Sequence, residues 1–303
     1  MHEEKQKWLD AMGSIPKSRN YGKATLINSF LFEDFHGEIY VQENGCGTNQ
    51  RVIMLFPKEM QKPAPAIAVP FYFPEAMLGS DPISGETLDT YRGIEMMLHL
   101  TRRGYVTISA EAFHLTYIKS EKSRGDFTRW QDAADELKRD HPEYTGIGKL
   151  FYDTELLIDM LCADSRVDSA RIGIAGHSLG GKMAFYTGCL DDRIGAILAS
   201  DFGIGWNQTN WQDDWYWGGK LEHLISKDMD HAELLSVASA KPFCLIAGKY
   251  DDEISKNVML QASGYDAEDD RLLFVNHATG HRPPMWALDM GYNFLDKWIR
   301  NKL

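Results

Sequence analysis

Residues 171–181 read R-I-G-I-A-G-H-S-L-G-G, and this stretch decides the fold. It begins with a short apolar run typical of a buried strand, continues with the pattern G-x-S-x-G, and is followed by a predicted helix over residues 182–189. Strand, tight turn and helix together predict a nucleophile elbow, which raises Ser178 above the edge of a parallel sheet. We expect a side chain at Gly176 or Gly180 to collide with the neighbouring strand or helix.

The chain around this stretch alternates strands and helices from residue 65 onward. Candidate strands cover residues 65–71, 105–110, 195–200, 243–247 and 271–276. Candidate helices cover residues 87–103, 150–162, 231–238, 255–264 and 284–302. This alternation predicts an α/β fold with a mostly parallel central sheet and helices on both faces. Closely spaced apolar runs separated by turn signals predict antiparallel strands ahead of that sheet, at residues 25–35, 38–43 and 51–56.

Two long segments interrupt the alternation, residues 111–149 and 201–220. Connections of this length are usually functional, so both are predicted to be insertions that shape a pocket. The whole chain, residues 1–303, is interpreted as a single domain, in which residues 1–60 form an N-terminal extension with the antiparallel strands.

The second segment is unusually rich in aromatic residues and carries four of the eight tryptophans. Aromatic rings beside amides and carboxylates suit the faces of sugars, because C–H groups stack on rings while hydroxyls are hydrogen-bonded. This makes four residues candidates for substrate binding: Trp206, Trp211, Trp215 and Tyr216. The alternative is a compact loop that packs on its own rings.

Composition excludes several classes of partner. The net charge of −12 argues against nucleic acid, since a phosphate backbone needs a basic surface. No apolar run approaches the length of about 18 residues that a membrane span needs. The N-terminus, M-H-E-E-K-Q-K-W-L-D, has no apolar core of signal-peptide length, so we expect a cytoplasmic protein. The sequence leaves the oligomeric state open.

A serine hydroxyl becomes a useful nucleophile only beside a base, which a third group must orient. After a nucleophile elbow the expected chain order is serine, acid, histidine. His281 follows the last predicted strand in N-H-A-T-G-H-R-P-P and is the preferred base, with His277 as its rival.

For the acid, the strand at residues 243–247 is followed by G-K-Y-D-D-E. Asp251 is preferred, Asp252 is the close alternative, and Glu253 is a third choice. Asp201, at the end of the preceding strand, is a weaker alternative.

Two backbone N–H groups are predicted to stabilise the oxyanion. The first belongs to Leu179, directly after the serine at the start of the helix. The second is expected from the loop after the first central strand, where Tyr72 is preferred and Phe73 comes next. Alternatively, these aromatic residues only form the wall of the pocket.

The motifs G-H-S-L-G-G, G-K-Y-D-D and G-H, in this order and at these spacings, resemble the α/β-hydrolase superfamily. The stretch D-S-R-V-D-S-A-R-I-G-I-A-G-H-S-L-G-G is similar to the dienelactone hydrolase and acetyl xylan esterase-like branch. The resemblance covers roughly residues 60–300. Dienelactone hydrolases proper use cysteine where this chain has Ser178. The cephalosporin-deacetylase type of acetyl xylan esterase usually has glutamine at the position of Leu179.

The resemblance implies a serine carboxylic-ester hydrolase that forms an acyl-enzyme, with Ser178 as nucleophile, His281 as base and Asp251 as acid. It implies no metal and no cofactor, and an ester of a small molecule or an acylated carbohydrate as substrate. A serine peptidase of the prolyl-oligopeptidase type would share the triad, but it usually carries a large extra domain. A catalytically inactive binding protein is the remaining alternative.

Overall fold

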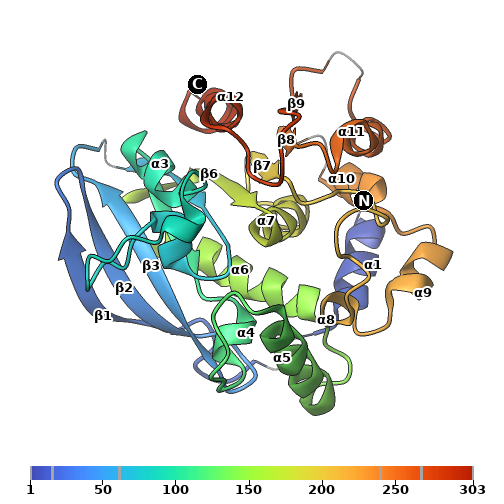
Figure 1. Ribbon diagram of the computed structural model, residues 1–303, viewed down its shortest axis with the longest axis horizontal. Helices are drawn as coiled ribbons and strands as arrows, with labels where there is room; N and C mark the ends of the chain where they lie inside the picture. The colour runs from blue at the N-terminus through green and yellow to red at the C-terminus, as the bar shows by residue number, and fades with distance from the viewer. Residues whose placement is uncertain (1, 15–16, 61–62, 239–240, 267–268, 302–303) are drawn as a thin grey trace.

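The computed structural model describes residues 2–14, 17–60, 63–238, 241–266 and 269–301. In this part of the chain, nine strands form one sheet in the order β1-β2-β3-β5-β4-β6-β7-β8-β9 (Figure 1). Their bounds are β1 (Ala24–Leu31), β2 (Phe35–Glu43), β3 (Asn49–Pro57), β4 (Ala64–Ala68), β5 (Val106–Ala110), β6 (Val167–His177), β7 (Ile197–Ser200), β8 (Phe243–Ala247) and β9 (Leu272–Asn276).

The sheet is antiparallel at its N-terminal side and parallel elsewhere. Strands β1, β2, β3 and β5 pair antiparallel in that order, whereas every neighbouring pair from β5 through β4 and β6 to β9 is parallel. Strands β4, β5, β7 and β8 are buried at every position. Parallel strands are covered on both faces, which explains why these read as continuous apolar runs. The predicted architecture is therefore confirmed.

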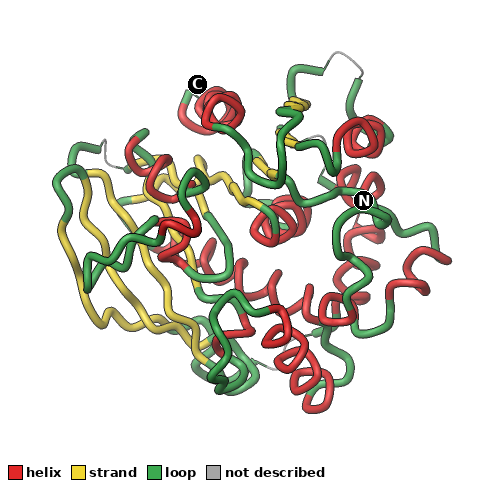
Figure 2. Tube along the Cα trace, in the orientation of Figure 1, coloured by secondary structure: helices red, strands yellow, loops and turns green. Residues whose placement is uncertain are grey.

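Helices cover both faces of the sheet (Figure 2). Their bounds are α1 (His2–Met12), α2 (Pro74–Leu78), α3 (Met96–Arg102), α4 (Phe113–Thr116), α5 (Phe127–Asp140), α6 (Gly146–Ala163), α7 (Leu179–Leu190), α8 (Asp214–Trp217), α9 (Leu221–Ser226), α10 (His231–Val237), α11 (Asp252–Leu260) and α12 (Met285–Leu295). One core cluster joins the sheet to α2, α3 and α12, and a second joins it to α1, α6, α7 and α10.

One predicted helix is wrong in extent. Residues 87–103 form a short 3-10 turn, Asp89–Tyr91, and then α3. Gly93 separates the two with a φ of +92°, which a continuing right-handed helix does not allow. Segment 111–149 is also more regular than expected, since it contains α4, α5 and the start of α6.

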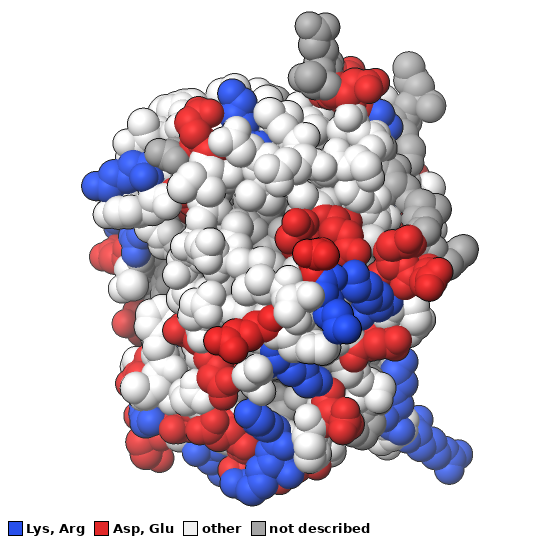
Figure 3. Space-filling view, turned by 90° about the vertical axis from the view of Figure 1, so that its right-hand side faces the viewer, with Lys and Arg blue, Asp and Glu red and all other residues white. Residues whose placement is uncertain are grey.

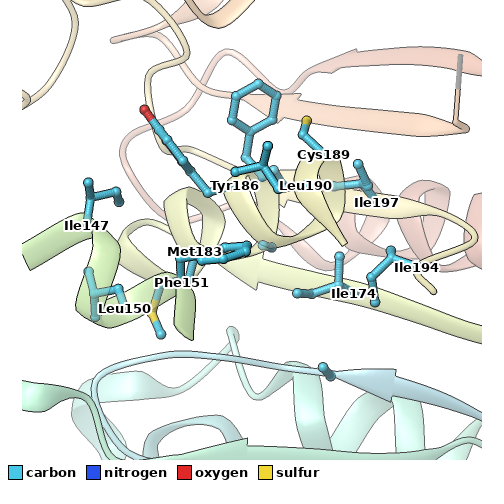
Figure 4. Packing of buried hydrophobic residues seen from close by; sticks show 14 of the residues in the cluster. Ile147, Leu150, Phe151, Ile174, Met183, Tyr186, Cys189, Leu190, Ile194 and Ile197 are labelled. Atoms are coloured by element: carbon cyan, nitrogen blue, oxygen red, sulfur yellow. The ribbon is translucent and has the colours of Figure 1, made fainter. Parts of the chain in front are cut away.

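Helix α7, which follows the elbow, is held by packing around its whole circumference. All twelve of its residues are buried. Figure 4 shows Met183 of this helix beside Phe151 of α6, while Tyr186 extends from the opposite side of the helix, and Ile174 of β6 belongs to the same cluster. A helix enclosed on all sides cannot shift without opening cavities, so the turn that precedes it is held in a fixed position.

The surface carries both signs of charge. On the face shown in Figure 3, acidic and basic side chains are interspersed. Across the described residues, no helix combines the length and the apolar character that crossing a bilayer requires.

Candidate active site

The turn between β6 and α7 has the strained geometry of a nucleophile elbow. Ser178 has φ 56° and ψ −118°, which is rare for a residue with a side chain. A Cβ at Gly176 would lie 2.0 Å from the carbonyl oxygen of Gly180, and a Cβ at Gly180 would lie 2.1 Å from that of Pro70. Both distances are far below van der Waals contact. The predicted need for glycine on either side of the serine is therefore confirmed.

The structure brings Ser178 and His281 together. His281 Nε2 lies 2.8 Å from Ser178 Oγ, although the two residues are 103 positions apart in sequence. His281 comes from the loop between β9 and α12, at the carboxyl end of the sheet. Desolvation, with the positive charges of Lys182 and Arg282, lowers the pKa of His281. The imidazole is therefore neutral near pH 7, the form that can accept the serine proton.

Besides Asp213, the cavity that holds Ser178 and His281 is lined by a second carboxylate, that of Asp201. Its Oδ1 lies 2.9 Å from His277 Nε2, and its Oδ2 accepts a hydrogen bond of 2.6 Å from the Ser200 hydroxyl. Burial raises the pKa of Asp201 to about 8, with a further contribution from the negative charge of Asp251. Like Ser178, Asp201 has a positive φ, 49°, directly after its strand.

Asp251 is buried in the turn between β8 and α11. Its Oδ1 accepts a hydrogen bond of 3.2 Å from the N–H of Gly248, and its Oδ2 accepts one of 3.1 Å from Gly203. These contacts join the ends of β7 and β8. Asp251 is not among the residues that line the cavity. Of the two alternatives in the turn, Glu253 is exposed, and the side chain of Asp252 lies outside the described residues.

No carboxylate among the described residues hydrogen-bonds to the second ring nitrogen of His281. Asp201 is nevertheless close to the loop that carries this histidine, because both border Gly248. A Cβ at Gly248 would lie 2.9 Å from Asp201 Oδ1 and 2.7 Å from the carbonyl oxygen of Gly280. Catalytic hydrogen bonds are often long in an empty site and tighten only when substrate binds.

His277, the rival base, is buried and makes no hydrogen bond with Ser178 among the described residues. Its two ring nitrogens contact Asp201 Oδ1 at 2.9 Å and the Thr279 hydroxyl at 2.7 Å. His177, next to the serine in sequence, is also buried, and its Nδ1 lies 3.3 Å from the hydroxyl of Ser200. Both histidines are thus engaged, through ring nitrogens, by hydrogen bonds with neighbouring side chains.

The candidate oxyanion donors lie around Ser178. Leu179 opens α7, where the first N–H groups of a helix have no partner within the helix. Leu179 and Tyr72 both line the cavity, and the backbone N–H of Tyr72 has no hydrogen-bond acceptor among the described residues. Phe73, the second choice, is buried at the start of α2, where the guanidinium of Arg124 lies 4.0 Å from its ring centre.

A cavity of about 670 Å³ opens above the serine. Both long segments contribute to its wall, the first through Phe127 and the second through six polar or aromatic residues. The lining residues are Tyr72, Phe127, Ser178, Leu179, Lys182, Asp201, Phe202, Thr209, Asn210, Asp213, Tyr216, Tyr250 and His281. This volume fits a small ligand or part of a larger one.

Lys182 adds a positive group to this cavity. Its Nζ donates to Asn210 Oδ1 at 2.7 Å and to Tyr216 Oη at 3.1 Å, and lies 4.0 Å from the ring centre of Trp211. No carboxylate of the described residues lies within ion-pair distance of it. Burial lowers the pKa of Lys182 well below its usual value, and the charge of Asp213 opposes this shift. An ammonium group has three N–H donors, so in its protonated form Lys182 keeps one for an oxygen atom of a ligand.

The aromatic residues of the second segment divide into two groups. Tyr216 lines the cavity, whereas Trp206, Trp211 and Trp215 are buried and do not. Trp206 and Trp211 pack edge to face, 5.4 Å apart. Their surroundings include Trp8 of α1, which stacks 6.4 Å from Trp206. The three tryptophans therefore lie in the packed interior of the loop, which favours the packing interpretation over the substrate-binding one.

Sequence reasoning missed Lys182, Phe127 and Tyr250. A signal for Lys182 was present, because residues four apart in a helix share one face and this lysine comes four positions after Ser178. Phe127 and Tyr250, both exposed, had no such signal, since their approach to the cavity depends on how separate loops pack. Among the described residues, no group of three or more His, Cys, Asp or Glu side chains is arranged to hold a metal ion.

Several solved structures with similar folds are carbohydrate esterases. A glucuronoyl esterase from Solibacter usitatus superposes with a TM-score of 0.70 at 13% identity, covering 97% of this chain and 91% of that one. A CE15 glucuronoyl esterase from Teredinibacter turnerae T7901 gives 0.67 at 15% identity, covering 96% and 83%. An acetyl xylan esterase from Paenibacillus sp. R4 gives 0.59 at 12% identity, covering 97% and 99%. At these identities the likeness establishes a shared fold.

Comparison of sequences finds a relative over part of the chain. No family model matches the chain. A curated protein of Bacillus subtilis (strain 168), "Putative hydrolase YtaP", is 28% identical over 166 residues. This match covers 50% of the chain and 54% of that protein, so the chain spans about half the length of the curated relative it matches.

Proposed function

We propose that this chain, which has the α/β-hydrolase fold, hydrolyses carboxylic esters through an acyl-enzyme formed on Ser178. One observation carries the proposal: the 2.8 Å contact between Ser178 Oγ and His281 Nε2, on a strained elbow that opens into a cavity. A serine within hydrogen-bond distance of a neutral imidazole can transfer its proton as it attacks a carbonyl carbon. The esterases that share the fold support the same reaction class.

In the first half of the reaction, Ser178 Oγ attacks the ester carbonyl while His281 Nε2 accepts the serine proton. The negative charge that develops on the carbonyl oxygen is stabilised by the N–H groups of Leu179 and Tyr72. His281 then gives its proton to the departing alcohol oxygen. In the second half, His281 takes a proton from water as the water attacks the acyl-enzyme, and then gives that proton to Ser178 Oγ as the bond between Oγ and the acyl carbon breaks, which releases the acid.

The acid of the triad is proposed from two candidates. Asp251 has the sequence position expected for it, but both of its oxygens accept backbone N–H groups at the ends of β7 and β8. Asp201 lines the cavity and borders the loop of His281. The location of its carboxylate favours Asp201 as the group that stabilises the protonated His281.

We propose an oxygen-rich ester, such as an acylated or esterified carbohydrate, as the substrate class. The support is the polar part of the cavity wall, where Lys182, Asn210 and Tyr216 hydrogen-bond to one another. Lys182 retains an N–H donor for a ligand hydroxyl or carboxylate oxygen. Of the four aromatic residues predicted to bind substrate, Tyr216 lines the cavity, and the three buried tryptophans do not.

Labelling with a fluorophosphonate tests the nucleophile. Wild-type protein should be labelled at one site and Ser178→Ala should not, because the reagent needs an activated serine. The same variant should lose on the order of 10⁶ in kcat on p-nitrophenyl acetate. Undiminished hydrolysis by a clean preparation of Ser178→Ala would exclude this residue as the nucleophile. A screen of acetylated oligosaccharides and methyl esters of uronic acids then tests the substrate class.

A further inference from the structure

The turn between β8 and α11 carries an aromatic ring that packing does not explain. Tyr250 is 65% exposed, yet it lines the cavity that holds Ser178. Among the described residues its ring has no aromatic neighbour, and the ammonium group of Lys249 lies 4.9 Å from its centre. A side chain that lines a cavity and is also mostly exposed lies at the opening of that cavity.

This turn packs against the loop that carries His281. The backbone N–H of Lys249 donates to the carbonyl oxygen of Thr279 at 2.9 Å, and a Cβ at Gly248 would lie 2.7 Å from the carbonyl oxygen of Gly280. Figure 1 shows α11, which follows the turn, on one side of α7, and α5, which begins at Phe127, on the other. Tyr250 is therefore on the side of the cavity that carries His281.

The proposed reaction gives this position a meaning. His281 donates its proton to the departing alcohol oxygen, so this oxygen must lie within reach of Nε2. Asp201 and His277, behind His281, are buried, so the rest of the alcohol extends from its oxygen toward the opening. The ring of Tyr250 lies at that opening.

We propose that Tyr250 is the binding platform for the alcohol portion of the ester, and that this alcohol carries a ring whose flat face stacks on the phenol. This inference rests on the proposed esterase function and names the part of the substrate that the residue selects. A sugar ring with its C–H face and the ring of an aryl alcohol share this chemistry. Stacking removes apolar surface of both partners from water, so an exposed ring gains most from it.

Such a contact acts in one half of the reaction. The alcohol departs when the acyl-enzyme forms, so Tyr250 can contribute to acylation and not to the later attack of water. Binding energy from a part of the substrate that does not react counts only where the substrate reaches it. The contribution should therefore be large for ring-bearing alcohols and absent for methanol, whatever the acyl group.

Two isomeric esters test this assignment. Benzyl acetate carries its ring in the alcohol, and methyl phenylacetate carries it in the acid. For Tyr250→Ala we expect kcat/KM on benzyl acetate to fall about tenfold and that on methyl phenylacetate to stay within about twofold of wild type. Tyr250→Phe keeps the ring and should retain the activity of wild type on both. An acetylated methyl xyloside is the third substrate: a fall on it as well identifies a sugar as the source of the ring, and a fall on benzyl acetate alone identifies an aryl alcohol.

Ile254→Ala is the matched control, because this exposed apolar side chain lies four residues further along on α11 and does not line the cavity. It should leave kcat/KM on all three esters unchanged.

Three results would overturn the inference. The first is a Tyr250→Ala enzyme that keeps wild-type kcat/KM on both benzyl acetate and the xyloside. The second is an equal fall on methyl phenylacetate, which would mean that the residue shapes the site as a whole or contacts the acyl group. The third is a Tyr250→Phe enzyme as impaired as Tyr250→Ala, which would assign the effect to the hydroxyl. Failure of the proposed function is distinguishable: wild-type protein would then hydrolyse none of the esters and resist labelling by the fluorophosphonate, and the inference would fail with it.

Discussion

Replacement of the two buried aspartates by asparagine, one at a time, tests which carboxylate supports His281. Asparagine has nearly the same shape as aspartate, so each change removes the charge and leaves the packing. The two side chains have different surroundings: Asp201 lines the cavity beside His277, and Asp251 bridges the backbone N–H groups of Gly203 and Gly248. The two variants should therefore fail in different ways.

For Asp201→Asn we expect a loss of activity with little loss of stability. A triad acid replaced by its amide costs about 10⁴ in kcat, because the imidazolium is no longer stabilised or oriented. At about 1.4 kcal/mol for each factor of ten, this is roughly 5.5 kcal/mol of transition-state stabilisation. The amide oxygen can still accept one hydrogen bond, from Ser200 or from His277, so the cost in folding free energy should be on the order of 1 kcal/mol.

For Asp251→Asn we expect the reverse. Each carboxylate oxygen accepts one backbone N–H, and an amide nitrogen in place of one oxygen would set a donor against a donor. A buried unsatisfied N–H costs about 1–3 kcal/mol. With a shift of roughly 2–4 °C per kcal/mol for a domain of this size class, the Tm should drop by about 2–12 °C. The kcat of the folded enzyme should stay within about tenfold of wild type.

The assay is p-nitrophenyl acetate hydrolysis from pH 6 to pH 9, with thermal denaturation of each variant. The upper end of this range matters because the pKa of Asp201 is raised to about 8, so its ionised form gains population as the pH rises through that value. If Asp251→Asn loses about 10⁴ in kcat and keeps its Tm, while Asp201→Asn stays active, the reasoning from the cavity is refuted and Asp251 is the acid.

Three further predictions follow from the site and the packing. Because the lowered pKa of His281 favours the neutral base, kcat/KM should rise with pH through a first midpoint below 6.5, separate from the rise near pH 8 that is expected as Asp201 ionises, and the absence of this first rise would contradict the assignment of His281. Lys182→Met should raise KM for carbohydrate esters about tenfold and leave p-nitrophenyl acetate nearly unaffected, since remote binding energy counts only for substrates that reach it; equal losses on both would refute the subsite. Trp211→Ala should lower the free energy of unfolding in urea by about 3–5 kcal/mol, whereas Trp286→Ala, 51% exposed, should cost far less; similar costs would contradict the packing interpretation.

Much of the fold could be predicted from local patterns in the sequence. The apolar runs that became β4, β5, β7 and β8 are buried on both faces, so burial alone determined their composition. The prediction of one continuous helix over residues 87–103 was wrong. The left-handed backbone conformation of Gly93 interrupts the helix, although apolar residues at helical spacing lie after it.

The aromatic segment shows the limit of composition as a guide. Trp206, Trp211 and Trp215 occur in a loop beside the cavity, which suggested contact with substrate. Trp8, about 200 positions earlier in the chain, lies against Trp206 and turns the same rings into part of the interior. A contact between residues so far apart in sequence leaves no periodic pattern that could be recognised in advance.

By itself the sequence determined the elbow, because the collisions that require Gly176 and Gly180 arise among residues of one tight turn and the strand beside it. It also determined that a histidine after the last strand could meet Ser178, since parallel strands end at one edge of the sheet. Only the tertiary structure decided which carboxylates line the cavity, which rings are buried, and that Lys182 reaches the site. The physical reason is that side-chain direction depends on packing between distant segments, whereas backbone conformation in a turn depends mainly on its own residues.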